Sequence, residues 1–300
     1  MDIQVTTPTS ISLEQVRVVH LEPTDVCQAA CPLCARETDP EFNKKSSHWL
    51  TVEDVKRILP EQVIGRLDKM FMCGVYGDPA AGADTLGLYD YFRDINNSIV
   101  LGMNTNGGIR GPWWWEQLAK RLCQPQDYVV FSIDGLADTN HIYRRNVDWP
   151  RVMANAAAFI SAGGNAHWDM LVYEHNRHQV EACERLARDM GFRWFRAKVS
   201  KRPLVNGLEY PVGWVRQDIQ SHVIDCHAIR EKSIYIDARG NIHPCCWLGE
   251  KQSNFHTDFD KIQASWHTKT PNPICQATCS VANAQTNFTA QWQKNIELTP

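Results

Sequence analysis

Three cysteines lie within one short loop near the N-terminus, with the spacing Cys27-x3-Cys31-x2-Cys34. A structural zinc ion or an ordinary iron–sulfur cluster takes four protein ligands. Three thiolates can instead hold three irons of a [4Fe–4S] cube, which leaves the fourth iron open to the amine and carboxylate of a free amino acid. The competing hypothesis is a zinc site completed by His48 or by a distant cysteine. The spacing thus predicts a metal centre, with an iron–sulfur cluster favoured.

Cysteine is the residue type that stands out in the chain as a whole, with eleven among 300 residues. A disulfide framework is typical of short secreted chains, and this chain is neither short nor visibly secreted. Clustered thiolates in a reducing compartment favour zinc or iron–sulfur ligation instead. Cys73, Cys123 and Cys183 lie outside the clusters. We expect these three to be buried as small hydrophobic side chains.

The rest of the composition is that of an ordinary folded protein. Hydrophobic residues make up 43% and charged residues 22% of the chain, and the formal net charge is −3. This charge gives no electrostatic reason to expect nucleic acid or an anionic membrane surface as a partner. The first residues lack the pattern of a signal peptide, and no apolar run approaches the roughly 18 residues of a membrane span. We therefore expect a cytoplasmic protein without a membrane or nucleic-acid partner.

Six β-rich segments alternate with helical segments between residues 16 and 200. The expected strands are 16–22, 69–77, 99–107, 127–135, 166–174 and 192–200. The expected helices are 51–59, 84–95, 112–123, 150–164 and 178–191. Thr51 is a suitable N-cap for the first helix, and Gly191 stands where the last one would end.

Repeated βα units of this kind predict a mostly parallel sheet with right-handed crossovers. Their spacing favours an α/β fold of the partial (β/α)6 TIM-like barrel type, and a doubly wound sheet remains the alternative. In either fold, chemistry takes place at the C-terminal ends of the strands. Polar segments follow this rule, because the cysteine loop and the segments 77–79, 104–106 and 132–134 each end or follow a predicted strand.

The pattern changes after about residue 205 to loops, cysteines and one predicted β-hairpin over 233–247, with the turn ARGN. Cys226 precedes this hairpin and Cys245 lies at its end. We therefore divide the chain into a barrel domain, 1–220, and a small cysteine-rich extension, 221–300.

The CxxxCxxC spacing directly after a first strand closely resembles the radical S-adenosylmethionine (SAM) superfamily. In that family, the three cysteines hold a [4Fe–4S] cluster whose open iron binds SAM. A GGEP-like turn follows the second strand of the family, and a backbone carbonyl of this turn meets the SAM amine. The matching residues here are Gly77, Asp78 and Pro79, with Asp in place of the usual Glu.

Two later segments resemble the same family, in the family's order along the chain. MNTNGG matches its TNG segment through Asn104, Thr105 and Asn106. FSIDG, which contains Ser132 and Asp134, matches its fourth-strand segment, where the serine approaches the SAM ribose. Arg144 stands where relatives pair an arginine with the SAM carboxylate, a group that suits a guanidinium, and Arg145 is its rival.

The C-terminal part resembles the SPASM and twitch extensions of this family. Cys226, Gly240 and Cys245 fit the opening pattern CX9–15GX4C, and Gly240 is expected in a turn that needs a positive φ angle. The shorter twitch form implies one auxiliary [4Fe–4S] cluster, held by Cys226, Cys245, Cys275 and Cys279. Cys246 could replace Cys245 or be a bystander, and a zinc ribbon remains the alternative.

The resemblance implies an oxidoreductase or maturase-type enzyme. An external flavodoxin- or ferredoxin-type reductant would deliver one electron, SAM would be cleaved to methionine and a 5′-deoxyadenosyl radical, and this radical would abstract hydrogen from a peptide or small metabolite. The auxiliary cluster would transfer electrons. Two other functions stay open: a conventional barrel lyase or hydrolase with structural zinc, and a non-catalytic iron–sulfur or zinc scaffold for electron transfer or protein binding.

No catalytic base is assigned from the sequence. The fifth predicted strand carries Asp169 and Glu174, and His175 follows them. Strand alternation puts Asp169 and Met170 on opposite faces but does not tell which face is inward.

Overall fold

Six parallel strands with helices between them form the larger part of the molecule. The computed structural model describes residues 11–45, 47–200, 202–205, 207–214, 223–249, 255–265, 268 and 270–279. The strands are β1 (Val18–Leu21), β2 (Lys69–Met72), β3 (Val100–Thr105), β4 (Tyr128–Ser132), β5 (Ala166–Val172), β6 (Trp194–Val199), β7 (Ser233–Ile236) and β8 (Ile242–His243).

Helices follow most of the strands. They are α1 (Ala35–Thr38), α2 (Val52–Ile58), α3 (Glu61–Ile64), α4 (Thr85–Ile95), α5 (Pro112–Arg121), α6 (Asn140–Tyr143), α7 (Trp149–Ser161), α8 (Val180–Met190), α9 (His227–Glu231), α10 (Cys246–Gly249), α11 (Phe255–Ser265) and α12 (Pro273–Cys279). Thr51 caps α2 as predicted, since its hydroxyl accepts from the Asp54 amide at 3.2 Å, and Gly191 ends α8 with φ +86°. In the described ranges, no helix has both the length and the apolar character that a membrane crossing requires.

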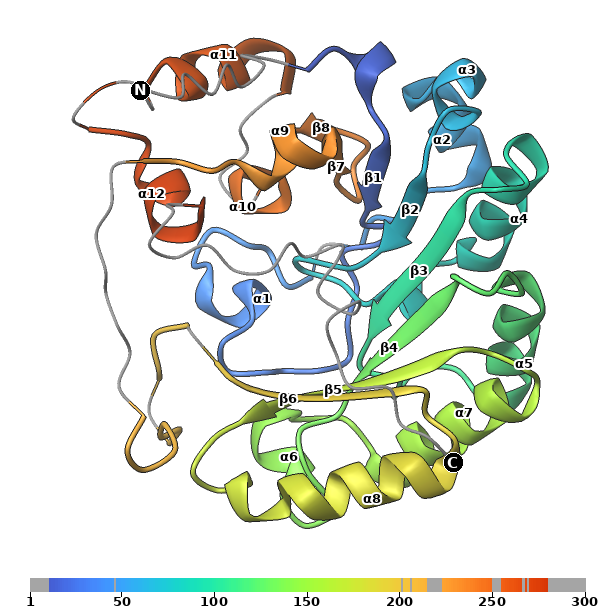
Figure 1. Ribbon diagram of the computed structural model, residues 1–300, viewed down its shortest axis with the longest axis vertical. Coiled ribbons are helices and arrows are strands. Elements are labelled where there is room, and N and C mark those ends of the chain that lie inside the picture. The colour runs from blue at the N-terminus through green and yellow to red at the C-terminus, as the bar shows by residue number, and fades with distance from the viewer. Residues whose placement is uncertain are drawn as a thin grey trace, which may run out of the picture.

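The order of the strands decides between the two predicted folds. The sheet runs β6-β5-β4-β3-β2-β1-β7-β8, and β1 to β6 are parallel neighbours in chain order. A doubly wound sheet reverses direction at an internal strand, whereas here every unit adds to the same edge. Figure 1 shows the result, a curved sheet with α4, α5, α7 and α8 on its convex side and α1 on its concave side. The partial (β/α)6 barrel is confirmed.

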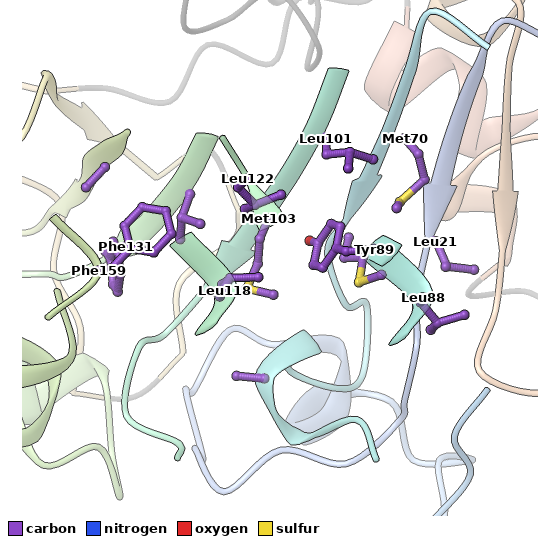
Figure 2. Packing of buried hydrophobic residues seen from close by; sticks show 14 of the residues in the cluster. Leu21, Met70, Leu88, Tyr89, Leu101, Met103, Leu118, Leu122, Phe131 and Phe159 are labelled. Atoms are coloured by element: carbon purple, nitrogen blue, oxygen red, sulfur yellow. The ribbon is translucent and has the colours of Figure 1, made fainter. Parts of the chain in front are cut away.

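The hydrophobic core lies between the convex face of the sheet and the surrounding helices. Figure 2 shows Met70, Leu101 and Met103 of the strands packing toward Tyr89 of α4 and Leu118 of α5. All five side chains are fully removed from solvent. Each such side chain contributes roughly 1.5–3 kcal/mol on burial, so this layer fixes the positions of the strand ends.

The same packing shows which strand residues face the inside of the barrel. Phe131 of β4 contacts Phe159 of α7, with ring centroids 6.0 Å apart, and therefore points outward. Its neighbour Ser132 then points inward, because successive strand residues alternate between faces. Ser132 pairs in register with Asp169, and Asp169 pairs with Arg196. These three residues form one inward-facing row, which answers the question that the sequence left open for Asp169.

The predicted hairpin is present and is joined to the barrel. β7 and β8 are antiparallel, and Gly240 in their turn has φ +84°, as predicted. β7 also pairs in parallel with β1 along its whole length, with Leu21 opposite Ile236. The hairpin therefore extends the sheet beyond β1 (Figure 1).

One prediction about the isolated cysteines is wrong. Cys183 is fully buried on α8 and Cys73 is partly buried, but Cys123 is exposed. α5 ends at Arg121 with Leu122 as its C-cap. Cys123 thus lies beyond the last helical turn, where the helical periodicity on which the prediction depended no longer applies.

Candidate functional site

The cysteine loop leaves the C-terminal end of β1 and lies on the concave side of the sheet (Figure 1). Cys31 is buried, and Cys27 and Cys34 are partly buried. The Cys34 amide donates to the Cys31 carbonyl at 3.0 Å, which makes the second half of the loop a tight turn leading into α1. The Ala30 amide donates to the Arg145 carbonyl at 3.0 Å and ties the loop to the segment after β4.

The electrostatics of these thiols fit a metal cluster. Burial raises the pKa of each thiol, that of Cys31 to about 11. Charge on Cys31 or Cys34 raises the pKa of Cys27 further, so the three sulfurs lie within one another's field. Buried thiols of this kind become thiolates only when a positive centre binds them. The donor set therefore suits a polynuclear cationic group.

The alternative of a single zinc ion has His48 or a distant cysteine as its predicted fourth ligand. His48 is held by Asp25, whose carboxylate accepts from the His48 amide at 2.7 Å and lies 2.9 Å from His48 Nδ1. Among the residues that the structure describes, no three His, Cys, Asp or Glu side chains are arranged to hold one metal ion. Three thiolates on three irons of a cube do not have to converge on one point.

The turn after β2 is fastened to the end of β3 by one carboxylate. Asp78 is buried and accepts from the Thr105 hydroxyl at 2.8 Å and from the Asn106 amide and side chain, both at 2.7 Å. Asn106 Nδ2 is also 3.6 Å from Cys27 Sγ, and Asn106 Oδ1 accepts from Gln28 at 2.8 Å. The cysteine loop and both predicted SAM-contacting segments thus form one bonded unit. Within it, the Asp78 carboxylate bonds to protein donors.

Gly77 stands where no side chain fits. A Cβ there would lie 1.9 Å from the Thr24 carbonyl oxygen, and one on Gly74 would lie 1.8 Å from the Gly77 carbonyl oxygen. The two glycines thus let the backbone of the turn pack closely, Gly77 against Thr24 and Gly74 against Gly77. They also end β2 at Met72, earlier than the predicted residue 77. Pro79 follows in a short 3-10 helix, Pro79–Ala81, with Asp78 as its N-cap.

The segment after β4 presents an arginine to the cysteine loop. Arg144 Nε donates to Asp134 at 2.6 Å, and Arg144 Nη1 lies 3.9 Å from Cys31 Sγ. The other oxygen of Asp134 accepts from the Leu171 amide at 2.6 Å. Asp134 therefore orients Arg144, and the rival Arg145 is exposed.

The comparisons with known proteins agree with this geometry. A sequence profile of the radical SAM superfamily matches residues 21–187, more than half of the chain. The chain belongs to the radical SAM superfamily of enzymes. The match begins at the end of β1 and contains the cysteine loop, the Gly77 turn, the TNG segment and Arg144. A search of curated protein sequences finds no match.

Two solved structures resemble this one in fold. SuiB of Streptococcus suis is 15% identical, with a TM-score of 0.57 over 85% of this chain and 66% of SuiB, just under two thirds of that protein. The protein anSMEcpe with bound AdoMet (SAM) is 13% identical, with a TM-score of 0.58 over 93% of this chain and 91% of its own. Other structures show SuiB with its precursor peptide SuiA and anSMEcpe with the Cp18Cys peptide. At these identities, the likeness shows a shared fold.

The barrel interior of this radical SAM chain carries a charged cluster that the sequence did not reveal. Asp169 accepts from Arg196 Nε at 2.8 Å and pairs with Lys198 Nζ at 2.9 Å. Nearby cations hold the pKa of Asp169 below its usual range, despite the opposing effect of burial. Lys198 is 40% exposed, so the cluster reaches accessible space. The sequence pattern that could have indicated this cluster is RAK in β6, where two cations alternate with an alanine. The pattern is informative only once it is known which face of the sheet points inward.

Glu22 is a second residue that the sequence analysis missed. It follows β1 directly and is 1% exposed. Its carboxylate accepts from the Tyr76 amide at 2.7 Å, from the Gly77 amide at 2.9 Å and from the Tyr235 hydroxyl. Burial raises the pKa of Glu22 to about 7. An acidic residue at the end of a buried strand was the available signal.

The four cysteines predicted for the auxiliary site are close enough for charge on one to shift the pKa of another. Cys226 has its pKa raised to about 12 by burial, and charge on Cys279 and Cys275 raises it further. Burial raises the pKa of the Cys245 thiol, and charge on Cys246, Cys226 and Cys279 raises it further. The Asp225 amide donates to the Cys279 carbonyl at 2.8 Å, which joins the segment before α9 to the end of α12.

Cys246 lies toward the barrel. Its charge acts on Cys73 at the end of β2 and on Tyr235 of β7. Cys245, by contrast, interacts with two other members of the predicted set. Cys245 as the ligand, with Cys246 as its alternative, stays a prediction.

Proposed function

We propose that this chain cleaves SAM reductively and uses the 5′-deoxyadenosyl radical to abstract hydrogen from a peptide or a small metabolite. The observation that carries the proposal is the bonded unit at the strand ends. Asn106 and Asp78 join the cysteine loop to the Gly77 turn, and Arg144 is held 3.9 Å from Cys31 Sγ. A SAM molecule bound at a cluster in this loop would meet the Gly77 turn and Arg144 at once.

Each residue has a distinct task in this proposal. Cys27, Cys31 and Cys34 hold a [4Fe–4S] cluster, which when reduced supplies the electron that splits SAM. The Gly77 backbone binds the SAM amine, and Arg144 binds the carboxylate as a planar cation suited to that group. Other contacts come from Asn104 on β3 and Ser132, whose inward hydroxyl meets the ribose.

Five further residues act on these groups rather than on SAM. Asp78, Thr105 and Asn106 hold the Gly77 turn in place, and Asp134 fixes the direction of the Arg144 guanidinium. Pro79 begins the short helix that follows. Loss of any one of them would displace a SAM-binding group by a fraction of an ångström or more, which is enough to slow a positioned reaction.

The substrate is proposed to enter from the concave side. Arg196, Lys198 and Asp169 line the inward face next to Ser132, so the substrate would react beside two cations and one carboxylate. The structures of SuiB with precursor peptide SuiA and of anSMEcpe with a peptide support a peptide. A small metabolite with a carboxylate fits the same charges.

Cys226, Cys245, Cys275 and Cys279 are proposed to hold one auxiliary [4Fe–4S] cluster, in an extension over 221–300 that follows a barrel domain over 1–220. Four thiolates close the cluster to substrate, so we infer a role in electron transfer. A flavodoxin- or ferredoxin-type protein would supply electrons. We propose a cytoplasmic location, because free thiolates persist in a reducing environment.

The test uses anaerobic, reconstituted protein. We expect about eight irons per chain and formation of 5′-deoxyadenosine from SAM with dithionite. Changing Cys27, Cys31 and Cys34 together to Ser should leave about four irons and abolish 5′-deoxyadenosine. Cys123→Ser is the matched control, because that cysteine is exposed and lies outside both groups. Zinc in place of iron, or a fully loaded triad that does not cleave SAM, would favour the scaffold alternative and refute the proposal.

A further inference from the structure

Glu22 connects three parts of the molecule that lie far apart in the sequence. Its own amide donates to the Ile236 carbonyl at 2.9 Å and continues the pairing of β1 with β7. One carboxylate oxygen accepts from the two amides of the Gly77 turn, and the other accepts from Tyr235 of the hairpin. The barrel, the SAM-binding turn and the C-terminal hairpin thus meet at one side chain.

A carboxylate at this position is costly to bury. Removing a carboxylate from water costs several kcal/mol unless its oxygens are satisfied. All three donors to Glu22 that the structure gives are neutral, and burial raises the pKa of Glu22 to about 7. An apolar residue would avoid that cost, but it would leave the Tyr76 and Gly77 amides without their acceptor. The Glu22 carboxylate therefore holds the Gly77 turn in position.

The turn is also held from its outer side. The Tyr76 hydroxyl donates to Asp39 at 2.8 Å, and its ring stacks on Phe42 with centroids 4.3 Å apart. Gly77 lies against Thr24 without room for a side chain. The Tyr76 side chain is thus anchored next to α1, while its backbone amide donates to Glu22 at 2.7 Å. The hydroxyl of Tyr235 is the contact that the extension makes with the Glu22 carboxylate.

We propose that Glu22 is a positioning residue that makes SAM binding depend on the C-terminal hairpin, because Tyr235 holds the carboxylate that holds the Gly77 turn. This inference rests on the proposed function, since it assumes that the Gly77 backbone binds SAM. Removal of the Tyr235 hydroxyl takes away the donor to one Glu22 oxygen. The carboxylate can then move, which weakens the hydrogen bonds that the Tyr76 and Gly77 amides donate to its other oxygen. The affinity for SAM then falls, while the bond-breaking step, which depends on the cysteine triad, is preserved.

Two variants test the inference in the reconstituted full chain. Tyr235→Phe and Glu22→Gln should each raise the KM for SAM roughly tenfold, with kcat for 5′-deoxyadenosine within about twofold and the iron content unchanged. The double variant should be no worse than the worse single one, because both changes break the same contact. Tyr91→Phe is the matched control, since it removes a tyrosine hydroxyl from α4 on the convex side.

A second readout does not need catalysis. Equilibrium dialysis with labelled SAM should show the same loss of affinity, and hydrogen exchange at the Tyr76 and Gly77 amides should be faster in Tyr235→Phe than in wild type. Unchanged SAM affinity together with unchanged exchange would overturn the inference, as would equal losses of iron and kcat, which indicate a folding defect. If Glu22→Gln does not load iron, Tyr235→Phe decides alone. A loaded wild type that fails to cleave SAM refutes the proposed function and this inference with it.

Discussion

Buried polar residues decide the geometry of this site at the scale of single side chains. Asp78 and Asp134 were predicted to contact the cofactor, and the structure places protein donors on their carboxylates. A carboxylate that accepts two or three hydrogen bonds is a rigid anchor, because moving it would leave several buried groups unpaired. Both residues thus align the groups proposed to bind SAM, namely the Gly77 turn and Arg144.

His20 leads to a prediction about pH. It is buried on the inward side of β1, and its ring stacks on that of Phe71 with centroids 4.5 Å apart. Burial lowers the pKa of His20 to about 4. Between pH 6.5 and pH 4, the unfolded chain takes up a proton that folded His20 does not. Stability from this group is therefore lost as the pH falls, by about 2 kcal/mol between pH 7 and pH 5.

Anaerobic urea unfolding at the two pH values checks this expectation. His20→Phe should reduce the difference in unfolding free energy between pH 7 and pH 5 by about that amount. His178→Gln, at an exposed position, should leave the difference unchanged. An identical pH dependence in wild type and His20→Phe would contradict the assigned role of burial.

At the scale of elements, the turn between β2 and α4 depends on close backbone contact. Gly77→Ala would place a methyl group 1.9 Å from the Thr24 carbonyl oxygen, and backbone atoms on both sides would have to move. We expect a loss of stability of about 1–3 kcal/mol. We also expect kcat/KM for SAM to fall by a factor of roughly 100, because the displaced turn carries a SAM-binding group.

Gly111→Ala is the control for this change. A Cβ at Gly111 meets nothing within 4 Å, and its φ of −115° suits any residue. Thermal unfolding and the SAM dependence of 5′-deoxyadenosine formation should separate the two variants. Equal behaviour of Gly77→Ala and Gly111→Ala would show that the turn adapts without cost.

At the scale of the whole molecule, the hairpin and the barrel share one sheet. β7 pairs with β1 over four residue pairs, and Cys226 and Cys245 flank the hairpin. The division into 1–220 and 221–300 is thus proposed on the change of sequence pattern, while the sheet continues across it. A disturbance of the auxiliary site should therefore reach the SAM site through β7.

Changing Cys226 and Cys245 together to Ser tests this connection. We expect about four irons to be lost and the KM for SAM to rise several-fold, because the hairpin that presents Tyr235 would lose the proposed auxiliary cluster as its anchor. Iron analysis and SAM titration measure the two effects. Loss of four irons with an unchanged KM would show that the hairpin keeps its place without the auxiliary cluster.

Local features of the site could be predicted from the sequence because neighbouring residues determine them. The spacing of Cys27, Cys31 and Cys34 sets which thiols one loop can present, and the alternation of strands and helices follows from hydrophobic periodicity. Gly240 was expected at positive φ because its turn requires it, and its φ is +84°.

Only the tertiary structure decided the remaining features, since they depend on which strands become neighbours. The order β6 to β1 shows a barrel, the packing of Phe131 turns Asp169 inward, and it is the Arg144 side chain that lies beside Cys31. Tyr235 and Glu22 are 213 residues apart in the sequence. Their contact exists because β7 adds to β1, and periodicity within a segment contains no information about that pairing.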